Sequence, residues 1–280
     1  MTDNKVSIQI VLVLYKIKIE DSQSYKTLCE HISVLSCKHE LLIYNNSSEF
    51  EIETNNNYVV INAKQNEMLA VAYNFALQRA IKYNHNWLLL LDQDTCLSEK
   101  YFEQINLALN SNKNFAAIIP KLHSGEVHLS PKSCSTLFGP WWMMNEIHKT
   151  GVIKDKIVQA LNSATLISTS SLQKIGGFSL EFPLYGLDYW IFFQLSKRKE
   201  QFYLMDVALS HDLSMLDYKN KMTKDRYSSI INAEYKFSKL IGLLAVLSFK
   251  VRLLFRLLRH LFTKDKRPYI VITFKHLLKI

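Results

Sequence analysis

Apolar runs and amphipathic stretches alternate along the first 120 residues of the chain. Residues 7–15 form a continuous β-branched apolar run, which is typical of a strand covered on both faces. In contrast, Leu69, Ala72 and Ala76 share one face of a predicted helix. On this basis the predicted strands are 7–15, 40–48, 57–63, 86–95 and 115–120, and the predicted helices are 22–36, 67–83 and 99–111. The alternation predicts an α/β fold with a mostly parallel central sheet and flanking helices.

The pattern changes in the second half of the chain. Residues 121–160 show weak periodicity, so we expect a long functional loop region there. Further predicted elements are a strand with a short helix over 162–178, a helix over 187–200, a strand over 202–212 and helical structure over 228–262. We therefore expect an α/β domain over residues 1–220 and a helical C-terminal segment over 221–280.

Charge narrows the classes of partner. The 280 residues carry a formal net charge of +9, and seven Lys or Arg but one acid lie between Lys250 and Arg267. Such an excess suits a phosphate-bearing substrate, a nucleic acid or an anionic membrane surface. Nearly half of the residues are hydrophobic, which is enough for a sizeable core and excludes wholesale disorder.

The cysteines favour a reducing compartment. The four cysteines form no CxxC pair and no zinc-ligand spacing. The N-terminal apolar run is too short to cross a bilayer, and we expect no signal peptide. The sequence therefore predicts a cytoplasmic location.

Two carboxylates follow the apolar run "LLLL" directly. Asp92 and Asp94 stand one residue apart at the carboxyl end of a predicted parallel strand, where open α/β sheets bind their ligands. Such a pair can share one Mg²⁺ or Mn²⁺ ion, which often binds substrate phosphates as well. The alternative is that both are solvated turn residues that cap a helix beginning near Ser98.

A series of motifs places this pair in a wider pattern. In chain order these motifs are "VLVLYK", "LLIYNNSS", "NEMLAVAYNFALQRA", "WLLLLDQDT", "NSATLISTSSLQKIGGF", "LYGLDYW" and "LSHD". The series resembles the inverting family 2 glycosyltransferases with a GT-A (Rossmann-like) fold. It is most similar to the bacterial rhamnosyltransferase branch that builds O-antigen and capsule polysaccharides. The resemblance covers roughly residues 5–215, the expected catalytic domain.

The resemblance implies a role for each matching residue. Asp92 and Asp94 would bind the metal and the nucleotide-sugar diphosphate, with His211 completing the metal site, and Asp188 would be the catalytic base. The residues expected around the nucleotide are Tyr15, Asn45, Asn46, Ser47, Asn66 and Asn74. A lone histidine such as His211 is also a common structural residue.

Three departures from the family pattern concern the donor. Tyr44 stands where the family has an aspartate, and Met68 stands where the helix start has a glycine. The usual arginine is absent from the helix after Asp188, unless Lys197 or Arg198 takes its place. A non-catalytic member of the family is therefore one alternative reading.

The residues around Asp188 suit a general base. Inversion needs a base on the face opposite the leaving diphosphate, and nearby aromatic side chains would raise the pKa of the carboxyl. Asp188 could equally be the N-cap of a helix over 189–199. Trp141 and Trp142, in the irregular region, could line the acceptor site or belong to the core.

The C-terminal segment contains a basic amphipathic helix. Arg252, Arg256 and Arg259 fall on one face, opposite Leu and Phe residues, a pattern typical of a helix in the membrane interface. Docking on the catalytic domain or on a second subunit is the alternative. Together with the resemblance, the segment predicts a peripheral enzyme at the inner face of the cell membrane. Its acceptor would be a saccharide on a polyprenyl diphosphate lipid, and its donor a dTDP- or UDP-sugar.

Two other classes remain as alternatives. A nucleotidyltransferase would use a similar sheet, but the chain has no Gly-rich phosphate loop and only seven glycines. A basic nucleic-acid-binding protein needs cations interleaved with aromatic residues across a surface, whereas here the charge gathers near the C-terminus. We therefore expect no nucleic-acid partner.

Overall fold

The structure is a computed structural model. It describes residues 6–49, 51–111, 113–135, 139, 144–211 and 222–279. Two compact units make up the chain: Met1–Lys132 with Glu146–Asp212, and Ser133–Asn145 with Leu213–Ile280. We call them unit one and unit two and describe each by itself. The predicted boundary at residue 220, and Trp141 and Trp142, lie outside the described residues.

Unit one is built on a nine-stranded sheet, with the strand order β3-β2-β1-β4-β11-β5-β12-β9 and with β6 paired to β5. Its strands are β1 (Ser7–Leu14), β2 (Lys38–Asn45), β3 (Tyr58–Asn62), β4 (Trp87–Leu91), β5 (Ala117–Ser124), β6 (Val127–Ser130), β9 (Gly151–Ile153), β11 (Thr165–Ser168) and β12 (Phe202–Ser210). Three further short strands are β7 (Lys132–Cys134), β8 (Asn145–Glu146) and β10 (Ile157–Gln159).

Most of the central pairings are parallel. β1 pairs in parallel with β2 on one side and with β4 on the other, β2 with β3, and β5 with β12. β11 runs antiparallel between β4 and β5. The chain leaves β1 toward β2 and later returns to β4 on the opposite side. This reversal of strand order is the kind of place where open α/β sheets bind ligands.

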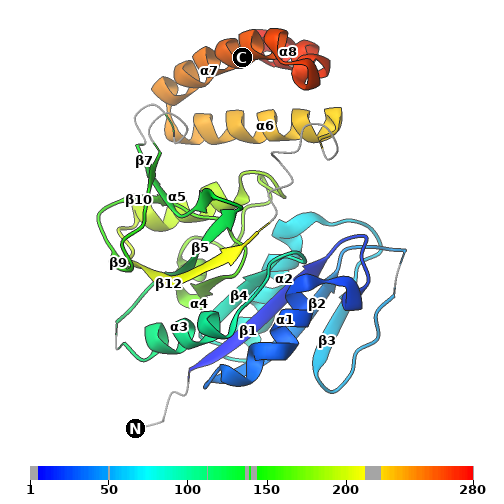
Figure 1. The fold of residues 1–280 in the computed structure, drawn as a ribbon, viewed down its shortest axis with the longest axis vertical. Coiled ribbons are helices and arrows are strands. Elements are labelled where there is room, and N and C mark those ends of the chain that lie inside the picture. Colours follow the sequence, from blue (N-terminus) through cyan, green and yellow to red (C-terminus); the bar gives the residue numbers. More distant parts are fainter. Residues whose placement is uncertain are drawn as a thin grey trace. The chain divides into compact units, whose positions relative to one another are not determined.

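Helices cover both faces of the sheet (Figure 1). They are α1 (Gln23–His31), α2 (Met68–Lys82), α3 (Glu99–Leu109), α4 (Thr169–Lys174) and α5 (Leu187–Lys197). Alternate β1 side chains such as Ile8, Ile10 and Leu12 pack in one core cluster with residues of α1 and α3. α2 contacts β1 and β4 through its buried Ala72 and Ala76. The continuous apolar runs are therefore strands with two covered faces, as predicted.

The prediction of a long loop region over 121–160 is wrong. β5 continues to Ser124, and β6 to β10 follow as short strands. Their periodicity is weak because each described strand has only a few residues, too few to show an alternation of apolar and polar positions.

Over residues 222–279, unit two contains the α-helices α6 (Lys224–Ile241), α7 (Leu243–Phe262) and α8 (Ile270–Lys279). The predicted helical structure over 228–262 is confirmed; it is divided into α6 and α7 at Gly242, which has φ +142. Glu234 of α6 accepts from Arg252 and Arg256 of α7, at 2.7 and 2.9 Å. Burial opposes ionisation of Glu234, yet the two guanidinium groups outweigh it and lower its pKa. Two of the three arginines predicted on the basic face of the amphipathic helix therefore bond to α6.

Candidate active site

The carboxyl ends of β1 and β4 carry the first group of predicted site residues. Asp92, Gln93 and Asp94 follow β4 directly, and Tyr15 follows β1. The side-chain carbonyl of Gln93 accepts from the Tyr15 backbone amide at 2.8 Å, and its backbone carbonyl accepts from the Ser22 hydroxyl at 2.9 Å. These bonds fix the turn between the two aspartates, so the central residue of "DQD" is a positioning residue.

Asp92, Asp94 and His211 come together at this edge. Each offers a possible ligand atom, and these atoms all lie within 4.8 Å of one another. His211 follows β12, a strand three places from β4 in the sheet. Its Nδ1 lies 3.7 Å from Asp94 Oδ1 and 3.2 Å from the hydroxyl of Thr95. Two segments more than 100 residues apart thus meet at one point.

The donor set fits a divalent cation. Carboxylate oxygens suit Mg²⁺ and Mn²⁺, and imidazole adds a nitrogen donor. Ligands on opposite sides of a Mg²⁺ ion lie about 4.2 Å apart, close to the spread of these atoms. Asp92 and Asp94 are not the N-cap of α3, because that position is Ser98.

Tyr73 of α2 also belongs to the site, although the sequence did not single it out. Its hydroxyl donates to Asp92 Oδ1 at 3.1 Å. Burial raises the pKa of Tyr73 well above its ordinary value, and the charges of Asp92, Asp188 and Asp94 raise it further. The three carboxylates therefore lie close enough to act on one phenol. A tyrosine on the buried face of a helix needs a partner for its hydroxyl, and this was the available signal.

Asp188 lies in the first turn of α5. The N-cap of that helix is Gly186, so the prediction that Asp188 is the N-cap is wrong. Asp188 Oδ1 accepts from the Tyr189 amide at 2.9 Å. Burial raises the pKa of the carboxyl to about 6; the backbone bonds act in the opposite direction, and the charge of Asp92 adds to the rise. Such a group changes protonation state near neutral pH, as a general base does.

The polar residues at the end of β2 and directly after it mainly hold the backbone. Asn45, Asn46 and Ser47 are buried. Asn46 Oδ1 accepts from the Glu67 amide at 2.7 Å, and Ser47 Oγ accepts from the Lys16 amide at 2.5 Å. Through these bonds they join the ends of β1 and β2 to the start of α2, beside the half-exposed Tyr15.

Asn66 and Asn74 have local partners as well. Asn66 Oδ1 accepts from the Met68 amide at 3.0 Å. The Asn74 side chain donates to the Phe178 carbonyl at 2.7 Å and accepts from the Phe178 amide at 2.9 Å. Asn74 thus clamps the segment that leads to Asp188. The adjacent Gly177 has φ +81, and a Cβ there would lie 2.6 Å from Asn74 Oδ1.

Two departures from the family pattern meet at the start of α2. The buried Tyr44 hydroxyl donates to the carboxylate of Glu67. Burial raises the pKa of Tyr44, and this carboxylate raises it further. Glu67 therefore places an acidic group beside position 44. Met68 has φ +66, a conformation that favours glycine.

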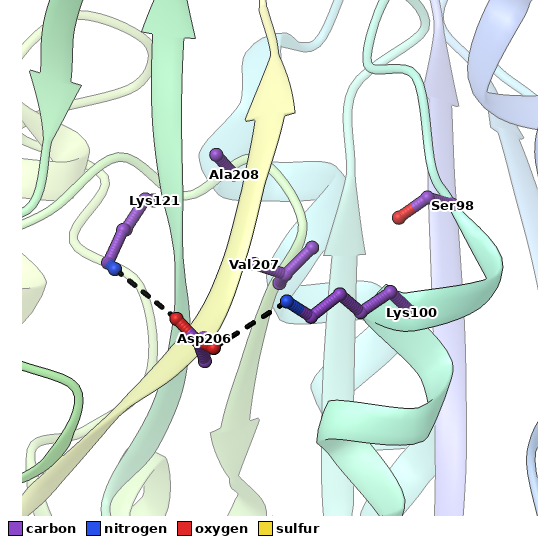
Figure 2. A pocket seen from close by; sticks show the side chains of 6 residues that line it. All are labelled: Ser98, Lys100, Lys121, Asp206, Val207 and Ala208. Carbon is purple, nitrogen blue, oxygen red and sulfur yellow. Dashed lines mark ion pairs between the residues drawn. The ribbon is translucent and has the colours of Figure 1, made fainter.

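Figure 2 shows a hollow on β12 whose lining residues are Ser98, Lys100, Lys121, Asp206, Val207 and Ala208, and none of them belongs to the Asp92 group. It opens where the pairing of β12 with β5 shifts between Leu204 and Ala208. Asp206 there pairs with Lys100 at 3.5 Å and with Lys121 at 3.6 Å. Because Asp206 offsets these two cations, the hollow is a weaker candidate for an anionic ligand than the Asp92 edge.

The sheet order and its flanking helices define the GT-A fold, which confirms the predicted fold class. GalNAc-T7, solved with UDP, GalNAc and Mn²⁺, aligns with a TM-score of 0.55 and 11% identity over 89% of this chain and 55% of that chain. This chain thus spans about half the length of that protein. The mannosyltransferase PcManGT from Pyrobaculum calidifontis, solved with GDP-Man and Mn²⁺, aligns with a TM-score of 0.50 and 10% identity over 99% of this chain and 86% of that chain.

No protein-family profile matches the chain, and no curated protein matches its sequence.

Proposed function

We propose that the chain is a metal-dependent, inverting glycosyltransferase that uses a nucleotide-sugar donor. The observation that carries this proposal is the convergence of Asp92, Asp94 and His211 beyond the sheet of a GT-A fold, with Asp188 close to them. The two solved structures with this fold contain Mn²⁺ and a nucleotide or nucleotide sugar, which supports the same ligand class here.

Asp188 is the proposed base. It takes the proton of an acceptor hydroxyl while that oxygen forms a bond to the anomeric carbon. The bond between this carbon and the nucleoside diphosphate breaks on the opposite face, so the configuration inverts. The partly buried position of Asp188 keeps its carboxyl basic enough for this transfer.

Asp92, Asp94 and His211 would hold the divalent cation, Mg²⁺ or Mn²⁺. When bound, the cation would offset negative charge on the diphosphate leaving group. Tyr73 orients Asp92 through its hydroxyl, and Thr95 contacts His211. The nucleotide would lie beside Tyr15, at the ends of β1 and β2.

The donor is proposed to be a dTDP- or UDP-sugar, with rhamnose as the transferred sugar, on the resemblance of the "LDQDT" motif. The acceptor is proposed to be a saccharide on a polyprenyl diphosphate lipid in bacterial surface-polysaccharide synthesis. The pair formed by Tyr44, near the carboxyl end of β2, and Glu67, at the start of α2, is the feature most suited to contact the nucleobase.

The exposed face of unit two supports a peripheral membrane location. Over the described residues no helix is long and apolar enough to cross a bilayer. The exposed apolar side chains of α7 and α8 include Leu243, Leu247, Val251, Leu254, Phe255, Leu258, Phe262, Val271, Phe274 and Leu278. We call these residues the apolar face. Exposed Arg259, Lys264, Arg267 and Lys275 lie in the same segment and suit anionic headgroups at the inner face of the cell membrane.

A thermal-shift panel tests the enzymatic proposal. We expect dTDP, UDP or GDP to stabilise the protein only with Mn²⁺ or Mg²⁺; a ligand at one hundred times its Kd adds about 2.7 kcal/mol. Asp94→Asn should lose the metal-dependent part, whereas Asp188→Asn should keep it and lose sugar transfer. Asp206→Asn, a change at the hollow on β12, is the matched control and should behave like the unchanged protein. The proposal is wrong if none of the nucleotides stabilises the protein.

A further inference from the structure

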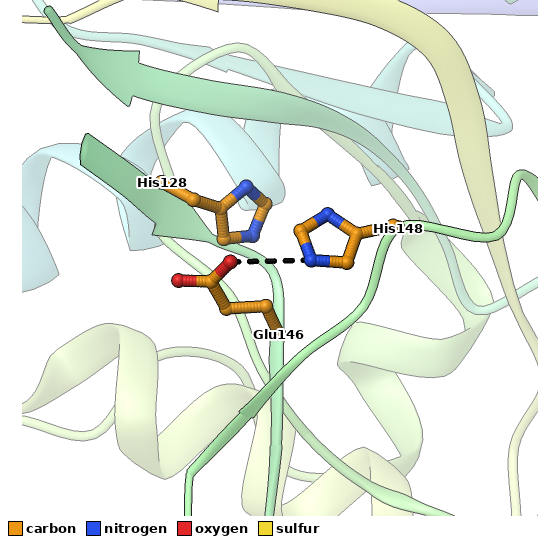
Figure 3. A group of neighbouring side chains, drawn as sticks. All are labelled: His128, Glu146 and His148. Carbon is orange, nitrogen blue, oxygen red and sulfur yellow. Dashed lines mark ion pairs between the residues drawn. The ribbon is translucent and has the colours of Figure 1, made fainter. Parts of the chain in front are cut away.

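A second group of metal-binding side chains lies outside the candidate active site. His128 of β6, Glu146 of β8 and the nearby His148 each offer a ligand atom, and these atoms lie within 4.8 Å of one another. Figure 3 shows the three side chains turned toward one point. All three belong to unit one, and none of them is part of the Asp92 group.

The separations within this cluster match those around one metal ion. His148 Nε2 lies 3.2 Å from Glu146 Oε2. Two ligands of a tetrahedral zinc ion, each about 2.0–2.1 Å from the metal, lie about 3.3 Å apart. The rings of His128 and His148 have their centroids 5.2 Å apart. The separation of Glu146 and His148 therefore suits two ligands of one ion, and the His128 ligand atom lies within 4.8 Å of both.

Both nitrogens of His128 have a neighbour that can fix its tautomer. Nε2 lies 2.9 Å from the Pro131 carbonyl, and Nδ1 lies 3.2 Å from His123 Nε2. Whichever nitrogen binds an ion, the other can donate its hydrogen to one of these acceptors. A hydrogen-bonded second nitrogen is typical of metal-bound imidazole.

His123 completes the surroundings of the cluster. His123 Nε2 lies 3.2 Å from His128 Nδ1, so His123 can accept from His128 when its ring is neutral. Its ring centroid lies 5.0 Å from that of His128.

A surface ion pair does not account for this arrangement. His148 and Glu146 have side chains that are 69% and 44% exposed, and such pairs contribute less than about 1 kcal/mol. His128, which is buried, lies beside these two side chains. A neutral His128 forms no ion pair with Glu146, so an ion pair does not explain its position in the cluster. Two imidazoles and one carboxylate are a donor set that suits zinc and related transition metals better than Mg²⁺ or Ca²⁺.

We propose that His128, Glu146 and His148 form a transition-metal site of the zinc class with a structural role. The site would join the β5–β6 hairpin to the segment after β8. His123, at the end of β5, accepts from the His211 amide through its backbone carbonyl at 2.9 Å. An ion in this cluster would thus steady the strand against which the His211 backbone lies.

Zinc binding by a chain without the first metal group tests this proposal. In an Asp92→Asn/Asp94→Asn background, we expect calorimetry to detect one Zn²⁺ per chain and Zn²⁺ to raise the Tm by several degrees. Co²⁺ should give the visible absorption of a nitrogen-liganded ion. Adding His148→Ala, a change at an exposed position, should lower the affinity at least tenfold. Adding His39→Ala, a histidine outside the cluster, should not.

The outcomes separate this proposal from the proposed function, since no nucleotide or sugar transfer is measured. If Zn²⁺ binding disappears in the Asp92→Asn/Asp94→Asn background, the ion belongs to the first group and the second site is wrong. If His148→Ala leaves Zn²⁺ affinity and the Co²⁺ spectrum unchanged, the assigned ligands are wrong. A Glu146→Gln variant provides a second check at another exposed position.

Discussion

At the scale of single residues, the partly buried carboxyl of Asp188 lowers the stability of the folded protein near neutral pH. Its pKa is about 6 in the folded protein, above the value near 4 of an unfolded chain. The folded state therefore binds this proton more tightly. The contribution of Asp188 to stability is most favourable below about pH 4 and is lost as the pH rises through 6. At pH 7.5 the ionised carboxyl opposes folding.

Asp188→Asn should therefore stabilise the protein while it abolishes sugar transfer. A full shift of two pKa units corresponds to about 3 kcal/mol, and partial exposure reduces the expected gain to about 1–2 kcal/mol at pH 7.5. Urea denaturation without metal, at pH 4 and pH 7.5, measures the gain and should show it shrinking at the lower pH. Asp206→Asn, at an exposed position, should change stability by less than 0.5 kcal/mol. An equal gain at both pH values would contradict the argument.

At the scale of elements, the start of α2 is strained by its side chain. Met68 has φ +66, and a non-glycine residue in this region costs about 1–2 kcal/mol. Met68 is 37% exposed, so its removal loses only part of the packing that a fully buried methionine would have. The glycine that the family pattern has at this position fits the conformation better.

Met68→Gly should raise the free energy of unfolding by about 0.5–1 kcal/mol, because the strain is relieved. The matched control is Gln78→Gly, at an exposed position within α2, which should lower it by about 1 kcal/mol. Chemical denaturation of both variants gives the comparison. A loss of stability in Met68→Gly would show that the side chain makes a contact worth more than the backbone strain.

At the scale of the whole molecule, the exposed apolar face of unit two has a consequence for location. We expect the chain to sediment with vesicles that contain anionic lipid and to remain in solution with purely zwitterionic vesicles. Phe255 and Phe262 are 58% and 85% exposed. The double change Phe255→Asp/Phe262→Asp should weaken vesicle binding at least tenfold, since burying one such ring contributes about 2 kcal/mol.

Leu107→Asp provides the control for vesicle binding. Leu107 is also 58% exposed, but it lies on α3 of unit one, so its change should leave binding intact. Equal binding to zwitterionic vesicles would contradict the role of the basic residues. Unchanged vesicle binding by the double variant would contradict the role of the apolar face.

Local sequence patterns predicted much of the fold. They did not predict which groups the side chains contact. The continuous apolar runs predicted the buried strands because both faces of the sheet are covered. The sequence did not predict that β11 lies antiparallel between β4 and β5, because its apolar pattern resembles that of a parallel strand. Arg252 and Arg256 were expected on a face toward the membrane interface, but they bond to Glu234, because helical periodicity identifies a face but not what lies against it.

In the candidate site, too, the sequence predicted some features and not others. Asp92, Asp94 and His211 lie together, and the motif order had linked them. Asn74 was expected beside the nucleotide, but its amide bonds to the Phe178 backbone. A sequence names the polar side chains of a motif; only the folded backbone shows which of them have partners within the protein.

The contact between Gly177 and Asn74 also constrains how this sequence can change over evolution. A side chain at position 177 would meet both an unfavourable φ and an oxygen 2.6 Å away. A substitution there is tolerable only if position 74 changes with it, so the two positions should vary as a pair in relatives of this chain. Such paired variation offers a marker for finding distant homologues, for which overall identity near 10% carries little information.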